Sequence, residues 1–169
     1  MINCLKVKAI LIFFASIVFA SVNLYAATVN DWTSLNNAVV SNDPSIIFST
    51  NLITYADNLT YPISYGEVVF GGNNITLDGN GNYQIFRVFN SSAVFNGRAS
   101  FINTKSISGG AIFLQSSTMT FTNSEVTFTY NSAVNGGAIA IFNGGYIEIL
   151  RGARFEYNSA NAGGAIYAS

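Results

Sequence analysis

The chain has 169 residues, which is enough for one domain, and 50% of them are hydrophobic. Only 9% are charged, against roughly 25% in typical soluble domains, and seven Lys and Arg residues against eight Asp and Glu give a net charge of −1. Because nucleic acid binding needs clustered cations, this low content of charged residues excludes nucleic acid as a partner. The chain contains no histidine, which excludes catalytic or metal sites built on histidine.

Residues 1–26 are typical of an export signal. Lys6 and Lys8 precede an apolar run over residues 9–22, and Ala26 offers a small residue for cleavage. A membrane-spanning helix is the alternative, but the run is shorter than the roughly 20 residues that a span needs. The single cysteine, Cys4, lies in this leader, so we expect an exported mature chain without disulfides or thiol chemistry.

Residues 27–81 are predicted to form an N-terminal cap and the first β-strands. Residues 30–40 have the pattern of a short amphipathic helix that begins at Asn30 or Asp31 as N-cap and ends at residues 42–44. Its apolar face comprises Trp32, Leu35, Ala38 and Val39. We expect this helix to cover the open end of a β-stack, where backbone groups would otherwise be unpaired; an ordinary surface helix is the alternative.

The early strands are short segments rich in β-branched and aromatic residues. They are expected at residues 46–48, 52–54, 67–70 and 75–77. The sequence Asp-Gly-Asn-Gly at residues 78–81 predicts a turn. A calcium ligand is the other interpretation of Asp78, but an isolated Asp in such a sequence favours the role of turn former.

Two short phrases repeat in the second half of the chain. Gly-Gly-Ala-Ile begins at Gly109, Gly136 and Gly163, so the interval between successive copies is 27 in both cases (136 − 109 and 163 − 136). A second phrase, Phe-x-x-Asn, begins eight residues before each Gly-Gly, except that Thr104 replaces Asn in the first copy. The motif residues of the last two copies are Phe128, Asn131, Gly136, Gly137, Ala138, Ile139, Phe155, Asn158, Gly163, Gly164, Ala165 and Ile166. A constant period of this length predicts a solenoid of similar coils with an extended surface.

Three strands are expected within one repeat, at residues 111–115, 118–122 and 125–130. Apolar side chains alternate with threonines in the second and third of these strands, which places the apolar set inside. The predicted inward set is Met119, Phe121, Val126, Phe128 and Tyr130. The predicted fold class is therefore all-β: a three-sided parallel β-helix with about 27 residues per coil over residues 82–169, after the capping helix.

Stacking of such coils would align like residues in columns. We expect an inward aliphatic column, an inward aromatic column, and a ladder of turn asparagines that stops at Thr104. The members are Ile85, Ile112, Ile139 and Ile166; Phe101, Phe128 and Phe155; and Asn131 with Asn158. The Gly-Gly pairs predict a bend with positive φ. Residues 146–150 fit the preceding coil only after a shift of one residue, which predicts a bulge or a longer turn at residues 143–145.

Acidic residues do not converge in this arrangement. Parallel β-helices include polysaccharide lyases and hydrolases, whose sites need acidic or basic groups on adjacent coils. Glu125, Glu148 and Glu156 fall at different points of the repeat. The residues expected opposite them, one coil earlier, are Arg98, Phe121 and Thr129. Since no two carboxylates stack, the sequence predicts no catalytic residue, no metal ligand and no cofactor.

The two phrases at constant spacing resemble the signature repeat of the chlamydial polymorphic outer membrane proteins, over about residues 82–169. These are autotransporter-type surface proteins whose passenger is a right-handed parallel β-helix. The resemblance implies a right-handed coil, adhesion to host or neighbouring cells, self-association at the surface, and no catalytic residues. Autotransporters end in a β-barrel in the outer membrane, and this chain stops at Ser169 without one, so we expect a truncated passenger that lacks its membrane link.

Three classes of function remain open from the sequence. The favoured one is the N-terminal passenger part of an adhesin at the cell surface or outside the cell. The second is a β-helical polysaccharide lyase or hydrolase whose active coils lie beyond residue 169. The third is a small secreted structural protein that assembles end to end through its last coil.

Overall fold

The computed structural model describes residues 26–64, 66–72, 74–122 and 125–169. The predicted export signal lies outside these residues except for Ala26. In the described part of the chain, no helix is both long enough and apolar enough to cross a membrane.

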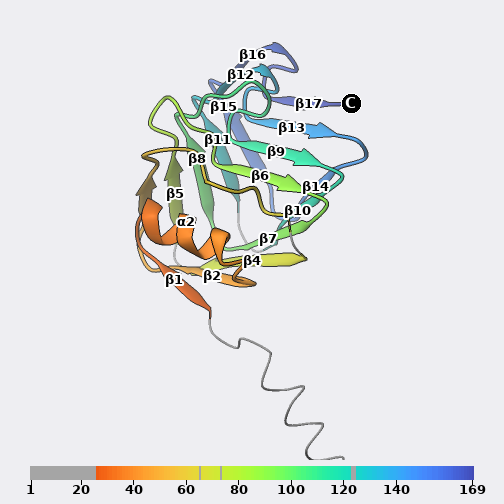
Figure 1. Ribbon diagram of the computed structural model, residues 1–169. Helices are drawn as coiled ribbons and strands as arrows, with labels where there is room; N and C mark the ends of the chain where they lie inside the picture. The colour runs from red at the N-terminus through yellow and green to blue at the C-terminus, as the bar shows by residue number, and fades with distance from the viewer. Residues whose placement is uncertain (1–25, 65, 73, 123–124) are drawn as a thin grey trace, which may run out of the picture.

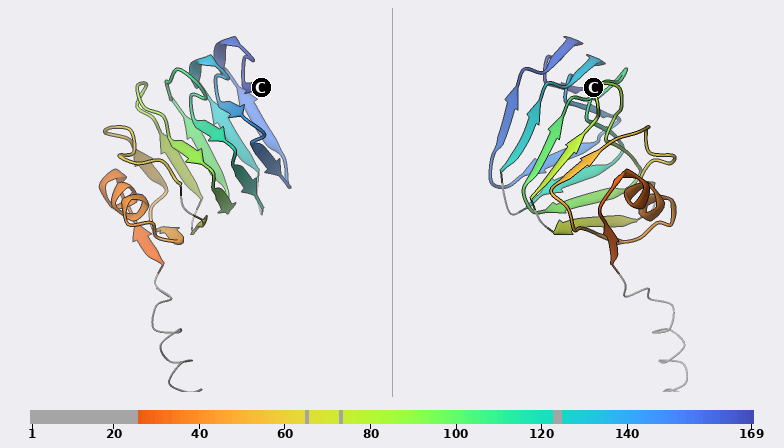
Figure 2. Two further views of the ribbon diagram at one scale, coloured as in Figure 1. Left: turned by 45° about the vertical axis from the view of Figure 1, so that its right-hand side comes forward. Right: turned by 90° about the vertical axis from the view of Figure 1, so that its left-hand side faces the viewer.

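Parallel strands wind into a β-solenoid of about five turns with about 26 residues per turn, which confirms the predicted all-β parallel β-helix (Figures 1 and 2). Three long sheets run along the solenoid. Sheet A contains β1 (Ala27–Val29), β2 (Ser45–Phe48), β4 (Glu67–Gly72), β7 (Ser92–Asn96), β10 (Thr118–Phe121) and β14 (Tyr146–Ile149). Sheet B contains β3 (Leu52–Thr54), β5 (Ile75–Asp78), β8 (Ala99–Ile102), β11 (Val126–Thr129) and β15 (Ala153–Glu156). Sheet C contains β6 (Phe86–Phe89), β9 (Ile112–Gln115), β13 (Ile139–Phe142) and β17 (Ile166–Ala168).

A short fourth sheet, sheet D, was not expected from the sequence. It contains β12 (Ser132–Asn135) and β16 (Ser159–Ala162). Sheet B shows where the room for it comes from. Leu77 pairs with Phe101, an interval of 24 (101 − 77), whereas Phe101 pairs with Phe128, an interval of 27 (128 − 101). The coils that follow Phe101 are longer, and two of the three added residues lie between sheets B and C, where β9 begins 10 positions after the end of β8 (112 − 102) but β6 begins 8 positions after the end of β5 (86 − 78). This added length forms the fourth side.

The predicted N-terminal helix is confirmed as α2 (Trp32–Val40). Asp31 is its N-cap: Oδ1 accepts a hydrogen bond from the Ser34 backbone N–H at 2.7 Å, and the Ser34 Oγ accepts one from the Asp31 N–H at 3.2 Å. The bonds from Ser34 hold the pKa of the Asp31 carboxyl below its usual value. The face that carries Leu35, Ala38 and Val39 is buried, and the helix lies beside β1 at the N-terminal end of the stack (Figure 2).

Aromatic rings fill the centre of the solenoid. Sheet A contributes an inward column that consists of Phe48, Phe70, Phe95 and Phe121. The predicted column of Phe101, Phe128 and Phe155 faces it from sheet B, and Phe101 meets Phe121 edge-on, with ring centroids 5.9 Å apart and an interplanar angle of 85°. Edge-to-face contact between two stacked columns is a favourable arrangement for aromatic rings.

The predicted aliphatic column is confirmed in part. Ile112, Ile139 and Ile166 pair in register across β9, β13 and β17. The prediction for Ile85 was wrong, because Phe86 is the residue that pairs with Ile112. The interval between Phe86 and Ile112 is 26 (112 − 86), one fewer than in the later coils. Subtracting the later period of 27 from Ile112 therefore gave Ile85 instead of Phe86.

The prediction that Tyr130 points inward was also wrong. Met119, Phe121, Val126 and Phe128 are buried, but Tyr130 is 59% exposed. It follows the last residue of β11 and has a φ of 58°, in the left-handed region. Such a residue breaks the alternation of a strand, so the ring turns outward at the corner.

The longer turn expected at residues 143–145 is confirmed. Gln115 pairs with Phe142, an interval of 27 (142 − 115), whereas Thr118 pairs with Tyr146, an interval of 28 (146 − 118). Asn143 and Gly144 both have positive φ in this turn. The next turn absorbs the extra residue, since Val126 pairs with Ala153, again an interval of 27 (153 − 126).

Candidate functional surface

Phenylalanines of the repeated phrase lie inside the solenoid and stack on one another. The rings of Phe101 and Phe128 have centroids 4.9 Å apart and an interplanar angle of 10°. Those of Phe128 and Phe155 are also 4.9 Å apart, at 5°. Because neighbouring strands of a sheet are spaced at about this distance, identical residues on successive coils stack face to face.

Asparagines of the phrase occupy an inner corner and link three coils. The Asn131 Nδ2 donates to the Phe101 carbonyl and to the Asn158 Oδ1, both at 3.0 Å. Its Oδ1 accepts from the Thr104 backbone N–H at 3.2 Å and from the Thr104 Oγ1 at 2.7 Å. Asn158 repeats the pattern by donating to the Phe128 carbonyl at 2.9 Å. The predicted ladder therefore exists, and Thr104 is bonded to it as its first member.

Glycines of the second phrase have two different roles. Gly136 has a φ of 62°, and a Cβ there would collide with the Ile139 carbonyl of the same coil. Gly110 and Gly137 lack positive φ, so in the first two pairs the predicted bend applies to the first glycine only, whereas Gly164 of the last pair has a φ of 23°. A Cβ on Gly137 would instead collide with the Gly164 carbonyl of the next coil. In these two pairs the first glycine forms the bend and the second allows the coils to approach.

The motif residues therefore form the scaffold. Phe128, Asn131, Ala138 and Ile139 are all 0% exposed, so none of them presents a side chain to a ligand. In the last coil of the described chain the corresponding positions are partly open, and Ile166 is 41% exposed. Any binding surface must be made by the residues that point outward between the motif positions.

One outward feature is a pair of stacked tyrosines at a corner. Tyr130 and Tyr157 occupy equivalent positions on successive coils, with φ of 58° and 54°. Their ring centroids are 4.8 Å apart, the rings are 8° from parallel, and the side chains are 59% and 72% exposed.

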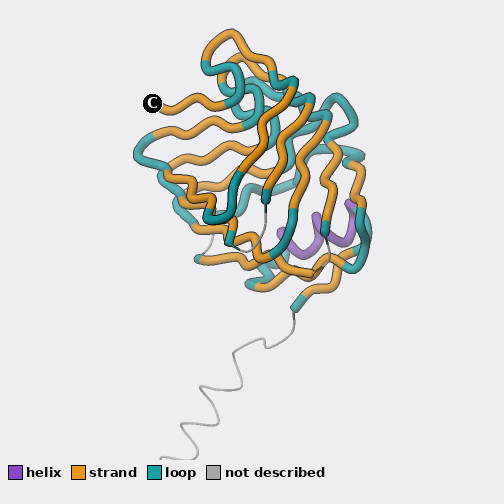
Figure 3. Tube along the Cα trace, turned by 180° about the vertical axis from the view of Figure 1, so that it is seen from behind, coloured by secondary structure: helices purple, strands orange, loops and turns teal. Residues whose placement is uncertain are grey.

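A second outward feature is a row of half-buried rings on sheet C, which we call the ring track. It consists of Phe89, Phe113, Phe142 and Tyr167. Successive centroids are 5.5, 5.3 and 5.5 Å apart, so the row is continuous over four strands. Figure 3 shows the solenoid from behind, with the strands of its sheets in parallel rows.

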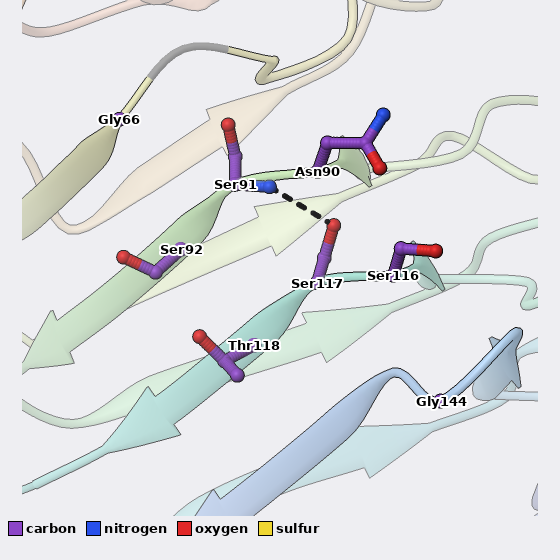
Figure 4. A pocket seen from close by; sticks show the side chains of 8 residues that line it. All are labelled: Gly66, Asn90, Ser91, Ser92, Ser116, Ser117, Thr118 and Gly144. Carbon is purple, nitrogen blue, oxygen red and sulfur yellow. Dashed lines mark hydrogen bonds between the residues drawn. The ribbon is translucent and has the colours of Figure 1, made fainter.

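The third outward feature is a shallow groove of about 390 Å³ at the corner between sheets C and A, which we call the corner groove. Asn90–Ser92 and Ser116–Thr118 line it from successive coils, with Gly66 and Gly144 at opposite ends (Figure 4). The Ser117 Oγ accepts a bond from the Ser91 N–H at 3.3 Å and donates to the Gln115 carbonyl at 2.7 Å. The Ser91 hydroxyl is buried, and no partner for it is present among the described residues.

Charged side chains form a small exposed cluster on sheet B. The Arg154 guanidinium lies 3.6 Å from a Glu125 carboxylate oxygen and 3.4 Å from one of Glu156. Glu156 lies opposite Thr129, as predicted. Glu148 lies opposite Thr120 and not Phe121, because the extra residue at positions 143–145 displaces β14.

Asp78 has a structural role in its turn. Its Oδ1 accepts a bond from the Asn80 N–H at 2.8 Å, which closes the turn that the sequence predicted. In the described ranges, no three His, Cys, Asp or Glu side chains lie close enough together to hold a metal ion.

Comparison with known families identifies the repeat. Residues 125–141 and 152–169 match the Chlamydia polymorphic membrane protein repeat. The two segments contain the second and third copies of both phrases, so the resemblance expected from the motifs is confirmed. Searches of curated proteins and of solved structures gave no match.

Proposed function

We propose that the chain is an exported, non-catalytic bacterial surface protein: part of the passenger of an autotransporter-type adhesin that contacts host or neighbouring cells. The observation that carries the proposal is that inward and outward positions of the repeat have different roles. Within the matched segment 125–141, the motif residues Phe128, Asn131 and Ile139 are buried in packing, whereas Tyr130 between them points outward and is free to make contacts. A rigid solenoid that displays exposed rings, such as Tyr130 and Tyr157, suits extended contact with another surface.

The adhesive role is tested with inert beads coated with the full chain and applied to cultured epithelial cells. We expect saturable attachment that the soluble chain competes away. Beads coated with the Phe128→Asp variant serve as the matched control, since that change places a charge in the core and should unfold the surface. Attachment no greater than that of albumin-coated beads would contradict the proposal.

Export is tested separately by fusing residues 1–26 to an alkaline phosphatase that is active only outside the cytoplasm. We expect phosphatase activity from this fusion, and its loss when Lys6 and Lys8 are both replaced by Glu. An inactive fusion would contradict the export signal and leave the adhesion test unaffected.

A further inference from the structure

The corner groove has hydrogen-bonding capacity that the chain itself does not use. In the part of the chain that the structure describes, the exposed Asn90 amide and Thr118 hydroxyl make no hydrogen bond to another residue. Ser91 is only 9% exposed and its hydroxyl oxygen has no partner there. Buried polar atoms are nearly always paired, so the unpaired Ser91 hydroxyl is an exception among the residues that line the groove.

The lining of the groove is uncharged. All eight lining residues are Asn, Ser, Thr or Gly. Among the described residues, the carboxylate bonded to the lining is that of Glu67, whose Oε2 accepts a bond from the Ser92 Oγ at 3.4 Å. A site for phosphate or an anionic polymer would need cations, and a cation site would need several carboxylate or carbonyl ligands. A neutral ligand rich in hydroxyl groups matches the donors and acceptors that are present.

Apolar rings occupy the chain positions next to these polar turns. Phe89 immediately precedes Asn90, and Phe142 immediately precedes the turn that contains Gly144, so two rings of the ring track are next to groove-lining turns in the chain. Both ends of the groove are glycines, and the lining residues come from successive coils, so the groove runs along the solenoid axis (Figure 4). A few fixed polar groups beside aromatic surface are the usual composition of a site for an organic ligand.

We infer that the corner groove and the adjacent ring track bind a neutral glycan chain that lies along the solenoid axis. Its hydroxyl groups would bond to Asn90 and Thr118, and the apolar face of its sugar rings would pack on Phe89 and Phe142. The inference rests on the proposed surface role and names the class of ligand for it. If the surface instead binds a protein partner, neither neutral oligosaccharide should bind, and the test below includes that outcome.

The test is titration of the full chain, labelled with ¹⁵N, with cellohexaose and with chitohexaose, followed by NMR. We expect saturable shift changes at residues 90–92, 116–118 and 142–144. Heparin hexasaccharide, which is anionic, should cause no saturable change at residues 90–92 and 116–118, because the lining of the groove has no cation. The inference is overturned if neither neutral oligosaccharide binds, if the changes map to sheet B, or if only heparin binds.

A pair of variants separates the groove from the rest of the surface. Asn90→Gly with Thr118→Val removes one amide and one hydroxyl; glycine accepts the φ of 48° at position 90, and valine keeps the shape of threonine. The matched control is Asn80→Gly with Thr129→Val. Asn80 also has a positive φ, of 55°, and Thr129 lies on sheet B, so the same two changes are made away from the groove. We expect the groove variant to weaken oligosaccharide binding about tenfold, as loss of two hydrogen bonds implies, and the control to bind like the unaltered chain.

The outcomes also separate this inference from the adhesive role. Attachment of coated beads without any oligosaccharide binding removes the glycan inference and leaves the adhesin proposal standing. Oligosaccharide binding at the groove without bead attachment removes the adhesin proposal and leaves the glycan inference standing. Equal binding by the groove variant and its control, with unchanged thermal unfolding of both, places the ligand elsewhere and overturns the assignment of the groove.

Discussion

Asn131 and Asn158 are joined side chain to side chain across one coil boundary, with the Asn131 Nδ2 donating to the Asn158 Oδ1 at 3.0 Å. The Asn131 backbone N–H donates to the same oxygen at 3.1 Å. Because Asn131 is fully buried and both ends of its amide are bonded, the corner depends on the orientation of one side chain.

Replacement of Asn131 by Ala should therefore be costly. It leaves the Phe101 carbonyl and the Thr104 hydroxyl without their buried partner, and we expect a loss of about 3 kcal/mol in the free energy of unfolding, measured by urea denaturation. Asn37→Ala, at an exposed position of α2, is the control and should change the free energy by no more than about 0.5 kcal/mol. Equal effects of the two substitutions would show that the ladder contributes nothing.

Two glycines with similar backbone angles should differ sharply in their tolerance of alanine. Gly136 and Gly144 have φ of 62° and 73°, but only at Gly136 would a Cβ collide with backbone, whereas nothing lies within 4 Å at Gly144. Gly144→Ala should cost about 1–2 kcal/mol from the left-handed conformation alone. Gly136→Ala should cost clearly more, because a carbonyl of the same coil must move. Thermal unfolding of the two variants gives the comparison, and a difference below experimental error would contradict it.

Inward and outward aromatic positions can be distinguished by the same substitution. Phe128→Asp places a carboxylate in the ring column, and we expect a large loss of the β-sheet signal in circular dichroism. Tyr130→Asp is the matched control two residues away. Its side chain is exposed and its positive φ suits Asp, so the spectrum should not change. An unchanged spectrum for Phe128→Asp would refute the stacked column.

Tyr55 should make the protein sensitive to alkali. Its ring is fully buried, and burial raises the pKa of its hydroxyl well above 10.0. A folded-state pKa above the unfolded value gives stability that is complete below about pH 10 and is lost as the pH rises toward the folded-state pKa. In Tyr55→Phe we expect the alkaline unfolding midpoint, followed by circular dichroism, to move to higher pH.

The control for this change is Tyr61→Phe, since Tyr61 is exposed. The Tyr55 Oη donates to the Ile85 carbonyl at 3.3 Å, so Tyr55→Phe should also lose some stability at pH 7. An identical alkaline midpoint in Tyr55→Phe and in the unaltered chain would show that this hydroxyl ionises without resistance.

Sequence patterns predicted the parts of the fold in which the chain repeats itself. Phe128 and Phe155 could be aligned from spacing alone, because coils of equal length put equal residues in register. Ile85 could not, since the coil before Ile112 is one residue shorter and no local signal marks the change. In the sequence, Tyr130 continues the alternation of inward and outward residues of β11, but its left-handed backbone turns the side chain outward.

The corner groove could not be predicted for a different reason. Its lining residues are short polar residues of turns that lie far apart in the sequence, such as Asn90 and Ser116. Each is ordinary turn composition by itself. They become a common surface only when the coil length brings the turns together. Ser91 and Ser117 are 26 residues apart. Aligning the turns of the sequence at this spacing could have revealed the corner groove.

Equal coil length has a consequence for how such a gene can change. From Phe101 to Phe155, equivalent residues on sheet B meet at a constant interval, and β11 contacts both the strand before it and the strand after it. Recombination between copies that adds or removes the codons of one whole coil would therefore leave the surviving hydrogen bonds in register. Inward positions are held by their neighbours, whereas outward positions such as Tyr157 are free to drift. The number of coils and the identity of the outer face can thus vary independently.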